Sequence, residues 1–302
     1  MFAFPKMLKV FKDQELQDAF ERDGFVVVPF YTETEVKELT ELYHRLHPKD
    51  EKGFFPSTFS KDKNYRTVAD AEIQRLCKRG MDHYLQDIKT MCGSFIVKSP
   101  GPESAMCVHQ DMTLVDESKY TGINIWVPLI DLTPTNGAIQ ALRGSHRLHP
   151  TYRGSSIPSF YETINEEIKP YLQPLYMKAG EALFFDQSII HYSEANLSDN
   201  VRIVTNTYFT HKDATFNIAY WNKDYGADKI ELFEEDDSFM TNFEQFGENI
   251  KDRPKIGKSL GLVDYNFPKM TAAELHCIYG RQTEELPVKK PLYKRVFDSL
   301  FQ

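Results

Sequence analysis

The residues of this sequence best suited to chemistry are a histidine and an aspartate two positions apart, His109 and Asp111. They lie in a short run, residues 108–112, that is typical of a β-strand, and alternate side chains of a strand point to one face. The imidazole and the carboxylate would therefore project into the same space. A second imidazole, from His191, would complete a two-histidine, one-carboxylate set, which leaves coordination positions open and suits non-haem Fe(II). We expect these three residues to bind iron beside a cosubstrate and O₂.

The spacing of this pair is a weak signal by itself, because the same spacing recurs at His211 and Asp213. Sequence context separates the two pairs. The first is followed by His191, which ends an apolar strand-like stretch, residues 183–191. After the second pair the only later histidine is His276, in a helical setting. We therefore interpret the second pair as surface residues.

An arginine downstream strengthens the assignment of the site. Arg202 follows His191 across a turn at residues 196–200, so the two would occupy neighbouring strands of one hairpin. Its neighbours in the chain are apolar, and a buried arginine without an anion is very costly. A carboxylate held by the two-pronged guanidinium is the natural partner. Ser193 would share the face of His191 and could donate to the same carboxylate.

Composition narrows the class of protein. The chain has 302 residues, 41% of them hydrophobic, which is normal for a protein with a sizeable core. Its net charge of −8 argues against nucleic acid or an anionic membrane as the main partner. Four cysteines without a CxxC pair indicate free thiols in a reducing compartment. No signal peptide is evident, nor a stretch of about 18 apolar residues that could span a bilayer. We therefore expect a soluble, cytoplasmic protein.

Three helices and a strand are expected in the first third of the chain. Residues 13–24 have amphipathic spacing, a capping box that begins at Thr32 starts a second helix, and residues 70–91 favour a third. Residues 25–28 indicate a short buried strand. The polar residues 48–66 are expected to form a loop near the site.

From residue 94 to residue 210 the sequence consists of short β-branched and aromatic runs separated by turns, which predicts strands. The expected strands are residues 94–99, 105–112, 122–130, 137–142, 174–178, 182–186, 188–194 and 201–210. Two metal ligands fall near the start of this series and one near its end. The pattern predicts a mainly β fold with flanking helices, a double-stranded β-helix, that is, a cupin-like jelly roll.

We expect a single domain over residues 1–302. Residues 1–93 would supply helical and strand support, and residues 94–210 the jelly-roll catalytic core. Within the core, residues 152–173 are expected to be a flap over the barrel mouth. Residues 211–302 show no clear strand periodicity and are expected to be a C-terminal extension of unknown role.

Together these residues resemble the Fe(II)/2-oxoglutarate dioxygenases of the phytanoyl-CoA dioxygenase family. The resemblance spans about residues 15–210. It is carried by the following positions: His109, Asp111, His191, Ser193, Arg202, Asp23 to Pro29, Trp126, Asn136 to His146 and Gly180 to Asp186. Each piece is common alone, and the combination is specific. The chain after residue 211 is not covered.

The resemblance implies an oxidoreductase whose cofactors are Fe(II), held by the three ligands, with 2-oxoglutarate and O₂ as cosubstrates and ascorbate as a candidate stimulant. The reaction would oxidise a C–H bond of a small-molecule metabolite and release succinate and CO₂. In related halogenases a halide occupies the position that the carboxylate of Asp111 fills here. Hydroxylation, desaturation or ring closure is therefore favoured over halogenation.

The resemblance also implies residues that bind the cosubstrate. Arg202 and Ser193 would hold the distal carboxylate of 2-oxoglutarate, and Trp126 would line its pocket. Lys98, on the strand that leads to the ligand pair, is a further candidate partner of this carboxylate. The alternative for Lys98 is a solvated lysine at a strand end.

Two other functions remain open on the sequence alone: a non-catalytic metal-binding jelly-roll module, and a Zn²⁺ or Mn²⁺ hydrolase or isomerase with the same ligands. Within the oxygenase interpretation, an amino-acid-like or secondary metabolite is a better substrate than phytanoyl-CoA, because the core lacks a dense basic cluster for the CoA phosphates. Candidate substrate residues are Tyr65, Arg66, Tyr152 and Arg153. The oligomeric state is not determined.

Overall fold

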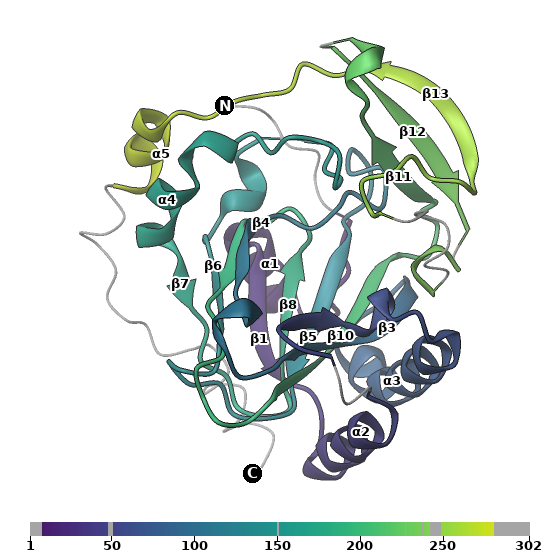
Figure 1. Ribbon diagram of the computed structural model, residues 1–302, viewed down its shortest axis with the longest axis vertical. Helices are drawn as coiled ribbons and strands as arrows, with labels where there is room; N and C mark the ends of the chain where they lie inside the picture. Colours follow the sequence, from purple (N-terminus) through teal and green to yellow (C-terminus); the bar gives the residue numbers. More distant parts are fainter. Residues whose placement is uncertain are drawn as a thin grey trace.

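The computed structural model describes residues 8–47, 51–149, 151–226, 228–236, 238–241 and 249–280. Two antiparallel β-sheets form its centre (Figure 1). The larger sheet runs in the order β1 (Phe25–Pro29), β8 (Glu181–Asp186), β5 (Ile123–Pro128), β10 (Arg202–His211), β3 (Ile88–Lys98) and β2 (Phe54–Pro56). The smaller sheet runs in the order β4 (Met106–His109), β9 (His191–Ser193), β6 (Ile139–Ala141) and β7 (Gln173–Pro174).

The path of the chain through the two sheets is that of a jelly roll. From β3 to β10 the chain places β3, β5, β8 and β10 in the larger sheet and β4, β6, β7 and β9 in the smaller one. The expected double-stranded β-helix with flanking helices is therefore confirmed. Each of the eight expected strands overlaps a strand of the structure, but the one expected at residues 174–178 is reduced to the two-residue β7. β3 begins at Ile88, earlier than residue 94, because its first residues pair with the end of β10.

Burial on both faces explains why the central strands are almost continuously apolar. In β5, Ile123 and Ile125 pack on the helix-covered side of the larger sheet, whereas Trp126 faces the smaller sheet. In β8, Phe184 packs on the helix side, and its neighbour Phe185 packs with Trp126 between the sheets. Strands buried on both sides lose the usual alternation of apolar and polar residues. The space between the sheets is where the predicted ligands meet.

Three helices support the larger sheet: α1 (Gln14–Asp23), α2 (Glu33–Leu46) and α3 (Lys63–Tyr84). The capping box predicted at Thr32 is present at the start of α2. The third helix was expected at residues 70–91, and this is wrong at both ends. The side chain of Asp62 caps α3 and starts it at Lys63, within the segment expected to be a loop, and residues 88–91 belong to β3 instead.

The extension after residue 211 contains strands that the sequence did not reveal. Strands β11 (Phe216–Tyr220), β12 (Lys229–Glu235) and β13 (Lys258–Asp264) form an antiparallel sheet, drawn in green to yellow in Figure 1. The short helix α4 (Asn165–Ile168) lies in the expected flap, and α5 (Ala272–Tyr279) follows the last strand. The extension packs on the jelly roll through apolar side chains of both parts: Met91, Leu114, Phe216, Ile218, Phe233 and Phe239.

No helix in the described part of the chain combines the length and apolar character that crossing a bilayer requires.

Candidate metal centre

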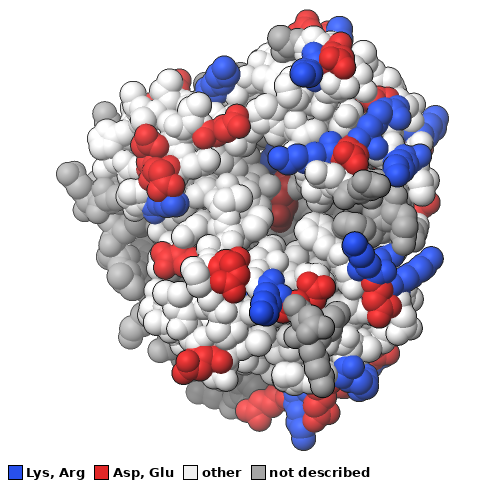
Figure 2. Space-filling view, viewed as in Figure 1, with Lys and Arg blue, Asp and Glu red and all other residues white. Residues whose placement is uncertain are grey.

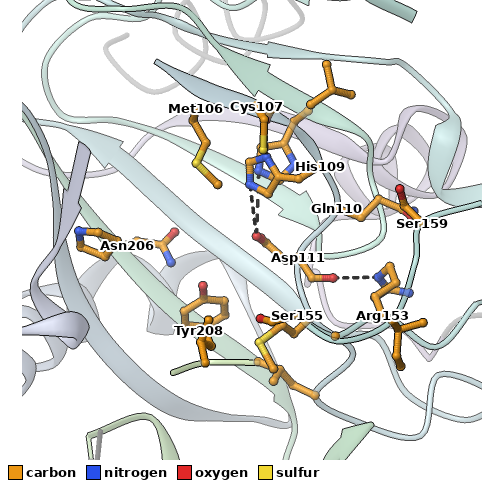
Figure 3. Close-up of a pocket in the computed structure, with 18 of the residues that line it drawn as sticks. Met106, Cys107, His109, Gln110, Asp111, Arg153, Ser155, Ser159, Asn206 and Tyr208 are labelled. Atoms are coloured by element: carbon orange, nitrogen blue, oxygen red, sulfur yellow. Dashed lines mark hydrogen bonds and ion pairs between the residues drawn. The ribbon is translucent and has the colours of Figure 1, made fainter. Parts of the chain in front are cut away.

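The structure brings the three predicted ligands together between the sheets. His109 and His191 are register partners on the antiparallel strands β4 and β9, and their ring centroids lie 4.0 Å apart. Asp111 follows β4, and its Oδ1 lies 3.8 Å from Nε2 of His109 and 4.0 Å from Nε2 of His191 (Figure 3). One donor atom from each side chain lies within 4.8 Å of the other two. This spacing allows a single ion to contact all three.

The hydrogen bonds of the two imidazoles leave their ε nitrogens available to a metal. Nδ1 of His109 lies 2.8 Å from the carbonyl oxygen of Cys107, and Nδ1 of His191 lies 3.1 Å from that of Ile189. A carbonyl oxygen only accepts, so each Nδ1 carries the hydrogen and each Nε2 keeps its lone pair. Burial, together with the neighbouring imidazole, lowers the pKa of His109 to about 3, which keeps the ring neutral. Two imidazoles and one carboxylate form a donor set that fits Fe(II).

Asp111 is held on three sides. Its Oδ2 accepts a hydrogen bond of 2.6 Å from the amide of Asn124 on β5. Its backbone N–H donates to the carbonyl of Gln187, and its carbonyl accepts from Nε of Arg153 at 2.8 Å. Burial raises the pKa of Asp111, since a carboxylate away from water lacks hydration. A divalent cation between the ligands would compensate for that loss.

The ligands line a cavity of about 780 Å³ that continues between the sheets. The predicted cosubstrate residues Trp126, Ser193 and Arg202 line the same cavity. The face of the molecule shown in Figure 2 is hollowed near its centre, with charged side chains of both signs around it.

Arg202 is a buried cation with few partners. It is 1% exposed and donates from Nη1 to the carbonyl of Gly137 at 2.9 Å, while its Nε has no partner. Gly137 has a φ of 72°, and a Cβ there would lie 2.6 Å from the carbonyl oxygen of Glu194, so the turn that presents this carbonyl requires glycine. The guanidinium carbon lies 5.3 Å from the ring of Trp126. Burial lowers the pKa of Arg202 to about 9.

Lys98 is a second buried basic residue beside Arg202, although it is not among the residues that line the cavity. It pairs with Arg202 in the register of β3 and β10, and it is 0% exposed. Its Nζ donates to the carbonyls of Ser193, at 3.0 Å, and Glu194. Burial first, and then the charge of Arg202, lower its pKa to about 6. Lys98 is therefore not a solvated strand end. Neither Arg202 nor Lys98 forms an ion pair with a carboxylate of the described residues, so the charge of Arg202 makes this part of the site fit an anion.

The structure separates the four candidate substrate residues. Tyr152 and Arg153 line the cavity, whereas Tyr65 and Arg66 do not. These two lie in the first turn of α3, where Tyr65 contacts Nδ1 of His47 at 2.9 Å and Arg66 donates to the carbonyl of Ser60. They were placed near the site because the segment was expected to be a loop.

The guanidinium of Arg153 already forms hydrogen bonds and an ion pair with other groups of the protein. Besides the carbonyl of Asp111, its guanidinium contacts both carboxylate oxygens of Glu117, one of them at 2.7 Å, and the carbonyl of Thr151. Arg153 therefore supports a metal ligand from the lining of the cavity, and its charge is balanced by Glu117.

Several lining residues were missed in the sequence. Asn206 and Tyr208 follow Arg202 at alternate positions of β10, so the period of a strand could have placed them on the same face. Apolar residues of the extension also line the cavity, and no pattern in the sequence connects them with the ligands: Met240, Ile250 and Tyr265.

Comparison with known proteins identifies the family to which this chain belongs. The model of the phytanoyl-CoA dioxygenase family, PhyH, matches residues 20–204, which is more than half of the chain. The chain belongs to the phytanoyl-CoA dioxygenase family. The resemblance inferred from residues 15–210 is thereby confirmed. The matched region contains the three predicted ligands, Arg202 and Lys98.

Curated relatives in this family match shorter regions. A phytanoyl-CoA dioxygenase domain-containing protein 1 homolog of Dictyostelium discoideum is 30% identical over 127 residues, 39% of this chain and 45% of that protein. A phytanoyl-CoA dioxygenase of Arabidopsis thaliana is 27% identical over 137 residues, 44% of this chain and 47% of that protein. The match thus spans less than half of the length of these two relatives.

Solved structures show a weaker likeness. The carbocyclase SnoK of nogalamycin biosynthesis, described as non-haem and alpha-ketoglutarate-dependent, has a TM-score of 0.49 and 19% identity, with 68% of this chain and 86% of that chain covered. The epimerase SnoN, solved with Fe³⁺, alpha-ketoglutarate and a nogalamycin, also has a TM-score of 0.49, with 67% and 85% covered.

Proposed function

We propose that this member of the phytanoyl-CoA dioxygenase family is an Fe(II)- and 2-oxoglutarate-dependent dioxygenase that hydroxylates, or otherwise oxidises at a C–H bond, a small-molecule metabolite. One observation carries the proposal. A two-histidine, one-carboxylate set lines the same cavity as a buried arginine that lacks an anionic partner. A site that only binds or senses a metal ion has no need of a buried arginine without an anionic partner.

Within this proposal each site residue has a role. His109, Asp111 and His191 would hold Fe(II), while Arg202 and Lys98 would hold the distal carboxylate of 2-oxoglutarate. Ser193 and Trp126 would complete the lining of the cosubstrate pocket. Bound iron and 2-oxoglutarate would supply the oxidation by O₂ and release succinate and CO₂.

The side chains of the protein act by placement and charge. Nε2 of each imidazole can face the metal, because the δ hydrogens are committed to carbonyls. The unused Nε of Arg202 can donate to a carboxylate, and a charged hydrogen bond is stronger away from bulk water. Apolar side chains between the sheets, such as Trp126 and Phe185, would limit the contact of a bound cosubstrate with water.

The direct test is succinate formation by the purified protein with Fe(II), ascorbate, 2-oxoglutarate and O₂, with and without a panel of candidate metabolites. We expect oxygen-dependent succinate that disappears in Asp111→Ala. Arg202→Ala should retain Mn²⁺ binding and lose about 2–5 kcal/mol of 2-oxoglutarate binding free energy, the usual effect of removing one partner of a buried charged pair.

Two results would contradict the proposal. One is wild-type 2-oxoglutarate affinity in Arg202→Ala, measured by calorimetry with Mn²⁺ in place. The other is the absence of succinate across the whole panel from protein that binds the metal. A hydrolytic product formed with Zn²⁺ or Mn²⁺ would instead support the hydrolase alternative.

A further inference from the structure

Two asparagine side chains form a chain of hydrogen bonds behind Asp111. Asn124 on β5 and Asn206 on β10 lie on adjacent strands of the larger sheet and are 0% and 2% exposed. Nδ2 of Asn206 donates to Oδ1 of Asn124 at 3.1 Å, and Nδ2 of Asn124 donates to Oδ2 of Asp111 at 2.6 Å. We call these two residues the amide relay.

The chemistry of the groups sets the direction of the relay. An ionised carboxylate only accepts hydrogen bonds, so Asn124 must turn its NH₂ group to Asp111 and its oxygen to Asn206. Asn206 must then turn its own NH₂ group to Asn124. The relay engages Oδ2 of Asp111. The other oxygen, Oδ1, is the one that faces the ε nitrogens of both imidazoles.

At the Asn206 end of the amide relay, one buried polar atom makes no hydrogen bond with the described part of the chain. Oδ1 of Asn206 is buried and has no hydrogen-bond partner among the described residues. A buried acceptor without a donor is destabilising, because it has lost its hydrogen bond to water. The amide of Asn206 also contacts the hydroxyl of Tyr208, which moderates the rise that burial causes in the pKa of Tyr208. Figure 3 shows Asn206 and Tyr208 on the side of the cavity that faces Asp111. Asn206 therefore satisfies its donor end and leaves its acceptor end unmet.

We propose that Asn124 and Asn206 are positioning residues that act in series to hold Asp111 in the orientation that binds the metal. Asn124 acts directly, and Asn206 acts only through Asn124. Neither side chain belongs to the three that offer donor atoms to a metal. This inference rests on the proposed function, because it assumes that the three ligands bind a divalent ion.

The test compares Mn²⁺ affinity by calorimetry, and the absorption spectrum of bound Co²⁺, in the full-length wild type and in variants. Asn124→Leu removes the direct donor at nearly constant volume. We expect its Mn²⁺ affinity to fall by about 10- to 100-fold, the usual effect of losing a hydrogen-bond partner of a metal ligand. Asn206→Leu should lower the affinity by a smaller factor, since Asn124 can still reach Asp111 but is free to turn. Both should shift the Co²⁺ spectrum.

The double variant distinguishes a relay from two separate structural effects. If Asn206 acts only through Asn124, the Asn124→Leu/Asn206→Leu protein should bind Mn²⁺ as Asn124→Leu does. If the two asparagines acted independently, the losses of Mn²⁺ binding free energy in the two single variants would add in the double variant.

Thr205→Val is the matched control. Thr205 is a fully buried neighbour on β10 whose side chain points to the opposite face and lies 3.4 Å from the hydroxyl of Tyr31. This variant should leave Mn²⁺ affinity and the Co²⁺ spectrum unchanged. Thermal melts check folding, and Asn124→Ala and Asn206→Ala replace any leucine variant that does not fold.

The possible results separate this inference from the proposed function. Wild-type Mn²⁺ affinity in folded Asn124→Leu, or additive losses in the double variant, would overturn the relay alone. A wild-type protein that binds neither Mn²⁺ nor 2-oxoglutarate would overturn the proposed function as well.

Discussion

At the scale of single residues, Lys98 is a titratable group whose charge should depend on whether an anion is bound beside it. Its pKa of about 6 in the fold lies far below the ordinary lysine value of 10.5, with burial as the main cause. Near neutral pH the amine is therefore mostly uncharged when no anion is present. A carboxylate placed beside Lys98 and Arg202 would favour the charged amine and raise this pKa.

This leads to a prediction about protons. Binding of 2-oxoglutarate to the Mn²⁺-loaded protein at pH 7–8 should take up a proton, and the uptake should be absent in Lys98→Met. Calorimetry in buffers with different ionisation enthalpies measures it. Equal proton uptake in the wild type and in Lys98→Met would show that another group is responsible.

The same shift predicts a pH dependence of stability. Between about pH 6 and pH 10.5 the unfolded chain binds more protons at Lys98 than the folded chain does. The free energy of unfolding of the metal-free protein should therefore rise with pH across this window by a contribution that Lys98→Met lacks. Urea unfolding of the two proteins at several pH values provides the comparison.

At the scale of elements, Arg153 joins the segment after the metal ligand to the segment that covers the cavity. Its backbone N–H donates to the hydroxyl of Thr113, and its carbonyl accepts from the N–H of Thr113. Its guanidinium reaches Asp111 and Glu117 on the same segment. The side chain of Arg153 is 7% exposed and that of Glu117 is 25% exposed, so this ion pair is largely desolvated.

Removing one partner of the Arg153–Glu117 pair should lower the free energy of unfolding more than removing both. Arg153→Met leaves the carboxylate of Glu117 without its counter-charge and should cost roughly 2–4 kcal/mol of unfolding free energy, toward the lower side of the range for buried pairs because Glu117 keeps some contact with solvent. Arg153→Met/Glu117→Leu should recover part of this loss. Chemical denaturation measures both, and additive losses would contradict the coupling.

At the scale of the whole molecule, the site draws on both sheets and on the extension. The histidines stand on the smaller sheet and Arg202 on the larger one, and Tyr265, after β13, completes the lining. A ligand that contacts all of these parts binds the folded chain and not the unfolded one. Such a ligand stabilises the fold by mass action.

We therefore expect the thermal midpoint to rise when Mn²⁺ is added and to rise further with 2-oxoglutarate. Each ligand at 100 times its dissociation constant should contribute about 2.7 kcal/mol. Removal of the metal by a chelator should also abolish the shift caused by 2-oxoglutarate. In His191→Ala neither ligand should shift the midpoint, and a full shift there would place the metal elsewhere.

Much of the fold could be predicted because its signals are local. The capping box at Thr32 and the strand runs from residue 94 to residue 210 depend on neighbours in the chain, and the structure shows them. The start of α3 was also signalled locally, by Asp62, but the polar segment before it favoured a loop. Strands β11 and β12 were missed although apolar residues of both pack against Met91 and Leu114 of the jelly roll, and β13 was missed because its apolar residues are largely exposed.

The sequence alone determined which residues could form a metal set and which cation could accompany it, since strand periodicity and the cost of burying a charge can be read without coordinates. Only the tertiary structure decided that β4 and β9 pair His109 with His191, that Lys98 lies beside Arg202, and that Arg153 serves Asp111. The hydrogen bonds of the amide relay were likewise visible only in the tertiary structure. These facts depend on contacts between strands far apart in the chain, and the register of a sheet is set by the packing of its faces.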